Sequence, residues 1–166
     1  MVELGYINMI KYLLLFLLFV TSPLTYGSIQ KDARCLAENI YFEARNQGTA
    51  GWLAVTDVTL NRMQSPDFPN TICEVVFQGP VNKDTKIPIR NKCQFSWWCD
   101  GLPEDIDNMG LYFEIFYFSN VMLTSERLMF DVTDGATYYH HHSINPKWSK
   151  DFEKTIRIGD HIFYRE

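Results

Sequence analysis

Glu43 is the residue of this sequence whose surroundings best suit acid–base chemistry. It lies among aliphatic and aromatic side chains in the stretch Asn39–Arg45, which reads Asn-Ile-Tyr-Phe-Glu-Ala-Arg. Apolar surroundings disfavour the charged form of a carboxyl group and raise its pKa, and a general acid needs such a raised pKa near neutral pH. The alternative is a structural role, with Glu43 as the half-buried partner of a nearby arginine. Glu43 is therefore the first candidate for catalysis.

An aromatic segment at residues 93–101 could bind a substrate. It carries the paired residues Trp97 and Trp98 together with Gln, Ser and Asp side chains. Sugar rings have apolar faces that stack on aromatic side chains and hydroxyl groups that form hydrogen bonds, so this composition suits carbohydrate binding. The alternative is that Phe95, Trp97 and Trp98 complete the hydrophobic core. The segment ends a long loop, residues 79–101, and loops of this length inside a compact domain are usually functional.

Three adjacent histidines, His140–His142, raise the question of a metal site. If they lie on a strand, alternation sends His140 and His142 to one face and His141 to the other. Two of these imidazoles and His161 could hold zinc, but no carboxylate ligand is evident beside them, and the helical His-Glu-x-x-His arrangement is absent from the sequence. We therefore expect no metal and no other cofactor. His140 is expected to form a hydrogen bond near the cleft, while its neighbours face solvent.

The four cysteines, Cys35, Cys73, Cys93 and Cys99, indicate disulfides rather than a metal site. An even number of cysteines in an exported chain favours disulfide formation. Zinc sites typically contain closely spaced pairs, whereas Cys93 and Cys99 are separated by five residues and the other two stand alone. Three pairings are open. We prefer a bridge between Cys73 and Cys93, which leaves Cys35 and Cys99 for the second.

Helices followed by a small sheet must position these residues. The predicted elements are helices over 32–46, 49–63 and 103–129, a short helical turn from Asn70 or Thr71 to Phe77, and strands over 136–142 and 155–164 with a turn at Gly159. Asp32 is the expected N-cap of the first helix. The third long helix has an apolar centre at residues 111–118, which we expect to be buried or paired.

The first helix separates its two central glutamates. At about 100° per residue, its apolar residues fall on one arc. They are Leu36, Ala37, Ile40, Tyr41 and Ala44. Glu43 lies at the edge of this arc, where it can border a core and a cleft together. Glu38 points the other way and is predicted to be a solvated surface residue.

The N-terminal residues read as an export signal. Residues 12–20 form an unbroken apolar run that is too short to span a membrane, Lys11 precedes it, and small residues end the segment near Gly27. We interpret residues 1–27 as a signal peptide, with an uncleaved anchor as the alternative, and residues 28–166 as one domain large enough to bury a core. This places the protein outside the cytoplasm, either secreted or in the periplasm or cell envelope. The formal net charge of −5 gives no support for a nucleic-acid partner.

Six segments, taken in order, resemble the SleB-like cell-wall hydrolases. They are Cys35–Arg45, Leu60–Arg62, Phe68–Cys73, Cys93–Trp97, Gly135–His140 and Ile158–Tyr164. Each segment alone is weak evidence, but their joint order and spacing extend over almost the whole chain after the leader. The sequence also departs from the family pattern. Tyr138 stands where many members have His, the His141–His142 extension is unusual, and the loop over residues 79–92 is particular to this chain.

The resemblance implies a peptidoglycan-cleaving domain, akin to spore-cortex lytic enzymes and similar to lytic transglycosylases. The implied fold is α+β and lysozyme-like, mainly helical with a small C-terminal antiparallel β-sheet. The implied catalytic residue is Glu43, and the expected substrate-binding residues are Gln94, Phe95, Ser96, Trp97, Tyr139 and His140. Peptidoglycan is the expected partner. The chain is expected to act as a monomer that touches the membrane only through an uncleaved N-terminal segment.

A single acid candidate favours one mechanism over another. Ordinary glycosidases need a second carboxylate, whereas in a lytic transglycosylase the hydroxyl group of the sugar attacks and the same residue takes its proton. We therefore expect Glu43 to act alone at the MurNAc-GlcNAc bond. Asp57 on a helix and Asp100 in the loop are the residues that could instead support a hydrolytic muramidase. Two functions of different classes also stay open, a cysteine-dependent hydrolase of the stem peptides with His140 as base, and a non-catalytic peptidoglycan-binding module.

Overall fold

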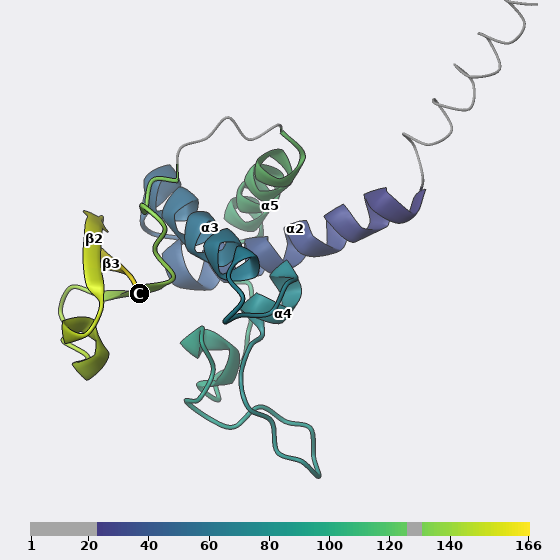
Figure 1. The fold of residues 1–166 in the computed structure, drawn as a ribbon. Coiled ribbons are helices and arrows are strands. Elements are labelled where there is room, and N and C mark those ends of the chain that lie inside the picture. Colours follow the sequence, from purple (N-terminus) through teal and green to yellow (C-terminus); the bar gives the residue numbers. More distant parts are fainter. Residues whose placement is uncertain (1–22, 126–130) are drawn as a thin grey trace, which may run out of the picture.

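The protein consists of a helical part with a small antiparallel sheet beside it (Figure 1). The computed structural model describes residues 23–125 and 131–166. In chain order the elements are α2 (Pro23–Ala44), α3 (Gly48–Gln64), α4 (Ile72–Val76), the 3₁₀ turn η1 (Ser96–Cys99), α5 (Met109–Thr124), β1 (Tyr138–His141), the 3₁₀ turn η2 (Lys147–Lys150), β2 (Glu153–Ile158) and β3 (His161–Arg165). The predicted α+β class, mainly helical with a C-terminal antiparallel sheet, is confirmed.

Helix α2 begins earlier than predicted. Asp32 lies inside the helix, so its assignment as the N-cap was wrong. Gly27 is the single weak helix former between Pro23 and Asp32, and one glycine costs only about 1 kcal/mol. Farther along, Gln30 donates a hydrogen bond of 2.8 Å to Asn120 of α5, which helps to hold this part of the helix in place.

The apolar arc of α2 forms the centre of the core. Leu36, Ile40 and Ala44 are fully buried, and they pack with residues of α3, α4 and α5. Glu38 differs from its prediction because it is partly buried rather than solvated. Burial raises the pKa of Glu38 although the positive charge of Arg34 opposes the change. Both glutamates therefore sit at partly buried positions, and the contacts of Glu43 must distinguish them.

Helix α3 joins the helical core to the sheet. Its bounds agree with the prediction, because Gly48 provides a backbone φ of +64° at the start and Ser65 takes the extended conformation that precedes a proline. Val55 packs in the core that α2 organises, whereas Val58 packs with Phe163 of β3. The helix is apolar on more than one side because it lies between two layers.

Helix α4 follows the predicted short turn, with the Thr71 hydroxyl accepting from the backbone N–H of Glu74. Helix α5, by contrast, begins at Met109 rather than near residue 103. The Asn108 side chain caps it by accepting from the N–H of Leu111, and this is the stronger start signal. Residues 126–129 of the predicted helix lie outside the described residues.

The apolar centre of α5 is buried on one side only. Tyr112 and Ile115 face α2 and belong to the core. Phe113 and Tyr117 are 60% and 72% exposed, so the centre is not buried as a whole. A helix that packs against one neighbour covers one face, whatever the composition of the other face.

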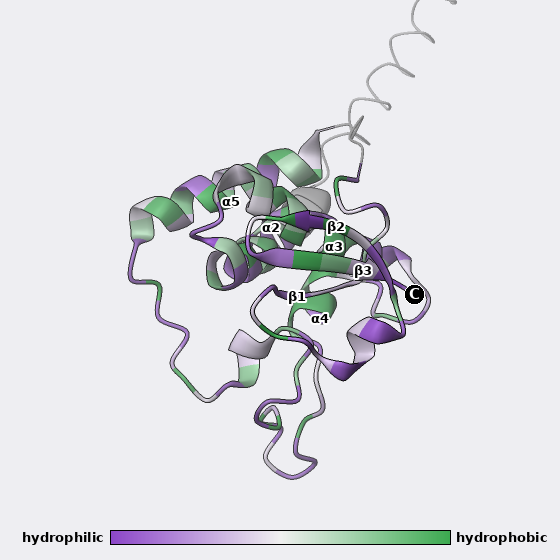
Figure 2. Cartoon of the chain, turned by 90° about the vertical axis from the view of Figure 1, so that its left-hand side faces the viewer, coloured by the Kyte–Doolittle hydropathy of each residue, from purple (hydrophilic) through white to green (hydrophobic). Residues whose placement is uncertain are grey.

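The three strands form an antiparallel sheet in the order β1-β3-β2, shown in front of the helices in Figure 2. The predicted turn at Gly159 joins β2 to β3, with a φ of +56°. In the β1–β3 register Tyr139 faces Phe163 and Tyr138 faces Tyr164. Because successive side chains alternate, Tyr139 points to the face that packs against the helices, and Tyr138 and His140 point to the other face.

Both disulfides join cysteines other than the pairs we preferred. The bridges are Cys35–Cys73 and Cys93–Cys99, so the predicted pairing was wrong. Packing of α4 against α2 brings the Cα atoms of Cys35 and Cys73 to 5.3 Å, and the turn η1 returns the chain until Cys99 lies 6.0 Å from Cys93. The loop between α4 and η1 projects from the helical part (Figure 1).

Within the two described ranges, no helix is both long enough and apolar enough to cross a membrane. Residues 1–22 of the predicted leader lie outside those ranges.

Candidate active site

Glu43 lies in the last turn of α2, where the helix meets the sheet. The hydroxyl group of Tyr139, on β1, donates a hydrogen bond of 2.9 Å to Oε2 of Glu43. The two residues are 96 positions apart in the chain. The partner of Glu43 is therefore a tyrosine from the sheet. The structure brings together the predicted catalytic residue and one of the predicted substrate-binding residues.

Burial sets the protonation of this pair. It raises the pKa of the Glu43 carboxyl, and the hydrogen bond from Tyr139 and the positive charge of Arg62 only partly offset the rise. Burial and the adjacent Glu43 carboxylate raise the pKa of Tyr139 well above its ordinary value. The phenol therefore stays protonated and donates, and Glu43 is a carboxyl group whose pKa lies closer to neutral pH than that of an exposed glutamate.

Arg62 of α3 is the site residue to which sequence reasoning assigned no role. It is only 3% exposed, its Nε donates a 2.7 Å hydrogen bond to the carbonyl of Thr137, and its guanidinium lies 4.7 Å from the ring centroid of Phe95. Its Nη1 is buried with no hydrogen-bond partner among the described residues. Burial lowers the pKa of Arg62, and the acidic groups of Tyr139, Tyr138 and Glu43 oppose this change. The Leu60–Arg62 segment of the family pattern was the signal that pointed to this position.

A polar network beside Arg62 holds the chain that leads into β1. Asn61 donates hydrogen bonds of 2.8 Å to Oδ2 of Asp131 and 3.0 Å to the carbonyl of Ala136. Asp131 also accepts from the backbone N–H groups of Thr133 and Gly135. These hydrogen bonds lower the pKa of Asp131 although burial raises it. Because β1 starts at Tyr138, the network fixes the strand that carries Tyr139.

The aromatic segment lies partly in the core. Phe95 and Trp97 are buried, which agrees with the structural alternative for these two residues. The Trp97 indole donates a 3.0 Å hydrogen bond to Asn39, and its ring stacks on Phe42 with the centroids 4.6 Å apart. The segment thus docks on α2 at the residue before Glu43.

Gln94 and Ser96 are exposed on either side of the buried Phe95. Trp98 is partly buried against Phe77, with the ring centroids 4.6 Å apart. The substrate contacts expected of Gln94, Phe95, Ser96 and Trp97 stay predictions.

His140 lies on the face of the sheet away from Glu43. Its Nε2 is 3.0 Å from the Tyr164 hydroxyl, and its ring stacks on that of Tyr164 and meets Trp148 edge-on. The expected hydrogen bond exists, and strand alternation sends Tyr139 and His140 to opposite faces of the sheet. The substrate contact expected of His140 stays a prediction.

The two candidate second carboxylates occupy different environments. Asp57 is buried in α3 and accepts a 2.9 Å hydrogen bond from the backbone of Val132, so it holds the segment before β1. Asp100 accepts from the N–H of Leu102 in a tight turn and lines a pocket of about 190 Å³ that also includes Phe42 and Arg45. Of the two, Asp100 is the one beside the end of α2.

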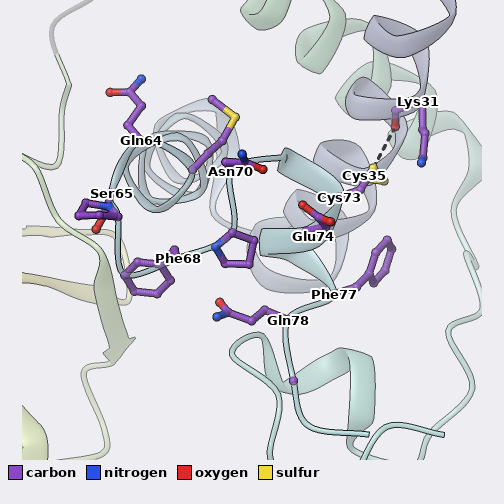
Figure 3. Close-up of a pocket in the computed structure, with 14 residues that line it drawn as sticks. Lys31, Cys35, Gln64, Ser65, Phe68, Asn70, Cys73, Glu74, Phe77 and Gln78 are labelled. Atoms are coloured by element: carbon purple, nitrogen blue, oxygen red, sulfur yellow. Dashed lines mark hydrogen bonds between the residues drawn. A yellow bond between two sulfur atoms is a disulfide. The ribbon is translucent and has the colours of Figure 1, made fainter. Parts of the chain in front are cut away.

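A wider groove of about 1050 Å³ opens on another part of the surface (Figure 3). Its lining comes from the C-terminal end of α3, the turn that follows, α4 and the middle of α2. The lining includes Lys31, Gln64, Phe68, Asn70, Glu74, Phe77 and Gln78 but not Glu43. The groove reaches Phe68, whose ring lies 5.3 Å from the Arg62 guanidinium.

Comparisons with known proteins agree on one family. The cell wall hydrolase family profile matches residues 46–164, beginning just after Glu43. The spore cortex-lytic enzyme of Bacillus subtilis is 42% identical over 52 residues, which are 31% of this chain and 17% of that protein. The corresponding enzyme of Bacillus cereus is 40% identical over 52 residues, 31% of this chain and 20% of that protein. The match thus spans about a fifth of the length of these curated relatives.

Two solved structures share the fold over most of the chain. The catalytic domain of the Bacillus cereus SleB protein superimposes with a TM-score of 0.57 at 26% identity, covering 82% of this chain and 91% of that chain. The catalytic domain of the germination-specific lytic transglycosylase SleB from Bacillus anthracis gives a TM-score of 0.57 at 26% identity, covering 82% and 95%. Because the family profile spans well over half of the sequence, the chain belongs to the cell wall hydrolase family.

Proposed function

We propose that this protein cleaves the glycan strands of peptidoglycan as a lytic transglycosylase, with Glu43 as its single acid and base. The observation that carries the proposal is the partly buried Glu43 carboxyl at the end of α2, held by a 2.9 Å hydrogen bond from Tyr139. Burial raises the pKa of this carboxyl, as a general acid requires. The likeness to a SleB domain described as a lytic transglycosylase supports the same reaction.

The proposed reaction returns the enzyme to its starting state without water. Protonated Glu43 gives its proton to the oxygen that links N-acetylmuramic acid to N-acetylglucosamine, and the bond from the muramic acid C1 to that oxygen breaks. The C6 hydroxyl of the same muramic acid attacks C1 and loses its proton to the Glu43 carboxylate. The products are a 1,6-anhydromuramic acid end and a free hydroxyl on the leaving sugar.

Tyr139 and Arg62 have supporting roles in this proposal. The Tyr139 hydroxyl orients the carboxyl and stabilises its charged form between the two proton transfers. The Arg62 charge favours the same form, as its effect on the pKa of Glu43 indicates. Both contributions are strongest when Glu43 has released its proton, which is when the reaction needs them.

Replacing Glu43 with Gln tests the assignment. The Glu43→Gln variant keeps an oxygen that can accept from Tyr139 but cannot donate a carboxylic proton, so release of muropeptides from purified peptidoglycan should fall by at least about a hundredfold. Glu38→Gln is the matched control, because it removes a partly buried carboxyl from the same helix and should keep activity. Full activity of Glu43→Gln would rule the proposal out.

Product analysis separates the proposed reaction from hydrolysis. Mass spectrometry should find anhydromuramic acid ends, whereas reducing muramic acid ends would favour the muramidase alternative. Asp100 is the residue to replace in that case, because it lines the small pocket beside Phe42 and Arg45. Asp100→Asn should leave a transglycosylase active and should inactivate a muramidase that uses it.

A stem-peptide hydrolase and a non-catalytic binding module would behave differently from a transglycosylase. A cysteine-dependent hydrolase needs a free thiol, but all four cysteines of the sequence are in disulfides. A non-catalytic binding module would bind peptidoglycan equally well as wild type or Glu43→Gln and would release no product from either.

The place of action follows from the substrate. Cell-wall cleavage requires action outside the cytoplasmic membrane, so we extend the proposal to residues 1–27 as a leader or anchor and residues 28–166 as a monomeric catalytic domain. Residues 23–27 are helical, so removal of the leader would take this part of α2 away. N-terminal sequencing of the exported protein would reveal whether the leader is cleaved.

A further inference from the structure

Three potential metal ligands meet at one end of the sheet, outside the proposed active site. They are His141, the last residue of β1, His142, which follows it, and Asp160 in the turn between β2 and β3. One ligand atom of each side chain lies within 4.8 Å of the others. The two histidines are exposed and Asp160 is partly so, which leaves the cluster open to a cation from solvent.

The tertiary structure supplies what the sequence lacked for a metal site. The expected alternation stops at His141, where β1 ends. His142 then donates its backbone N–H to the carbonyl of Asp160 over 2.8 Å, and this bond holds it beside the β2–β3 turn. The ring centroids of His141 and His142 consequently lie 4.6 Å apart. A continued strand would have sent the two side chains to opposite faces of the sheet. Asp160 is the carboxylate that the sequence pattern did not reveal.

Neighbouring residues hold these side chains in place, as the surroundings of metal ligands usually do. Gln47, in the segment between α2 and α3, donates 2.9 Å to Oδ2 of Asp160 and accepts 3.0 Å from its backbone N–H. The other carboxylate oxygen, Oδ1, faces Nδ1 of His142 at 3.7 Å. For His141, Nδ1 accepts a 3.2 Å hydrogen bond from the backbone N–H of Ser143 and lies 2.7 Å from the Ser143 hydroxyl, and these contacts hold the ring in place.

We propose that His141, His142 and Asp160 bind a divalent transition-metal ion of the Zn²⁺ type, with water completing the coordination. Two imidazoles and one carboxylate suit Zn²⁺ better than the hard cations Mg²⁺ and Ca²⁺, which prefer oxygen ligands. Zn–N and Zn–O bonds of about 2.0–2.2 Å require the ligand atoms to draw together. The two exposed imidazoles achieve this by rotating toward the Asp160 carboxylate, without movement of the strands.

The bound ion would clamp three parts of the chain. It would link the end of β1 to the β2–β3 turn, and through Gln47 it would tie both to the segment after α2. The sheet also connects this cluster to Tyr139. His161 pairs with His141, and the centroid of its ring lies 5.0 Å from that of the Tyr139 ring. The proposal does not depend on the proposed glycan cleavage, because it concerns binding and stability.

Zinc titration of the full chain, purified without a polyhistidine tag, tests the proposal. Calorimetry with Zn²⁺ should show one ion bound per chain with a micromolar or lower dissociation constant, and Mg²⁺ should show none. At a Zn²⁺ concentration about one hundred times that dissociation constant, the melting temperature of the protein should rise by at least about 5 °C. Co²⁺ in the same site should give visible absorption bands of a low-symmetry complex.

Variants show whether these residues are the ligands. His142→Ala and Asp160→Asn should each weaken Zn²⁺ binding at least about tenfold, and Gln47→Ala should weaken it by about 10-fold through the carboxylate it holds. Asp84→Asn, which removes an exposed carboxylate from the loop after α4, should bind Zn²⁺ as the wild type does. His142 is exposed, so its variant should fold, as circular dichroism would verify. Absence of Zn²⁺ binding by the wild type would overturn the proposal. So would a Zn²⁺ affinity equal to that of the wild type in both His142→Ala and Asp160→Asn.

Discussion

Removing one hydroxyl group should change the pH dependence of the proposed reaction in a defined direction. The Tyr139→Phe substitution deletes the hydrogen bond of 2.9 Å to Glu43 and keeps the aromatic ring that packs against Phe163. That hydrogen bond lowers the pKa of Glu43. Its loss must therefore raise the pKa further and leave Glu43 protonated to a higher pH.

The magnitude follows from the difference between two hydrogen bonds. A hydrogen bond to a charged group contributes about 1.5–3 kcal/mol and one to a neutral group about 0.5–1.5 kcal/mol. The hydroxyl thus favours the charged form of Glu43 by about 1–1.5 kcal/mol, and about 1.4 kcal/mol corresponds to one pH unit. If protonated Glu43 is the general acid, the alkaline limb of the activity profile should move upward by about one pH unit.

Initial rates of muropeptide release at low substrate concentration, measured across pH, report this limb for the free enzyme. Tyr138→Phe is the matched control, because it removes a hydroxyl from the adjacent residue, which lies on the opposite face of the sheet. The limb of the control should stay where it is in the wild type. An alkaline limb that does not move in Tyr139→Phe, or that moves to lower pH, would refute the role given to this hydrogen bond.

Two further predictions concern stability. Glu43→Gln should unfold at a higher temperature than the wild type at neutral pH. The pKa of Glu43 in the folded protein is raised above its ordinary 4.5, so the wild type loses stability as the pH rises from about 4.5 through this raised pKa. The higher melting temperature of the variant should therefore vanish below about pH 4.5, as melting curves across pH would show. Replacing Cys35 and Cys73 with Ser removes a bridge between residues 38 positions apart and should lower the free energy of unfolding in urea by about 4 kcal/mol. Replacing Cys93 and Cys99, which are 6 positions apart, should lower it by about 2 kcal/mol. Equal losses would show that native packing, rather than loop entropy, sets the value of each bridge.

Local signals in the sequence determined much of the fold. Gly48 and the Ser65–Pro66 step mark the two ends of α3, and Thr71 caps α4, because these residues act on the backbone next to them. The same reasoning failed at the start of α5, where Asn108 is the cap and the residues from Pro103 are not helical. Competing start signals in neighbouring residues cannot be ranked without the packing of the helix that follows.

The sequence by itself singled out Glu43 as a candidate, since its neighbours on the same predicted helix are apolar. The burial that raises its pKa comes with the folded structure. Only the tertiary structure decided its partners, Tyr139 and Arg62, because each comes from another element. The same holds for the disulfide pairing and for Asp160, which the pairing of β1 with β3 brings next to His142. Periodicity along a chain reports which side of an element is apolar. Contacts between elements depend on how those sides pack together, and that is fixed only when the whole chain folds.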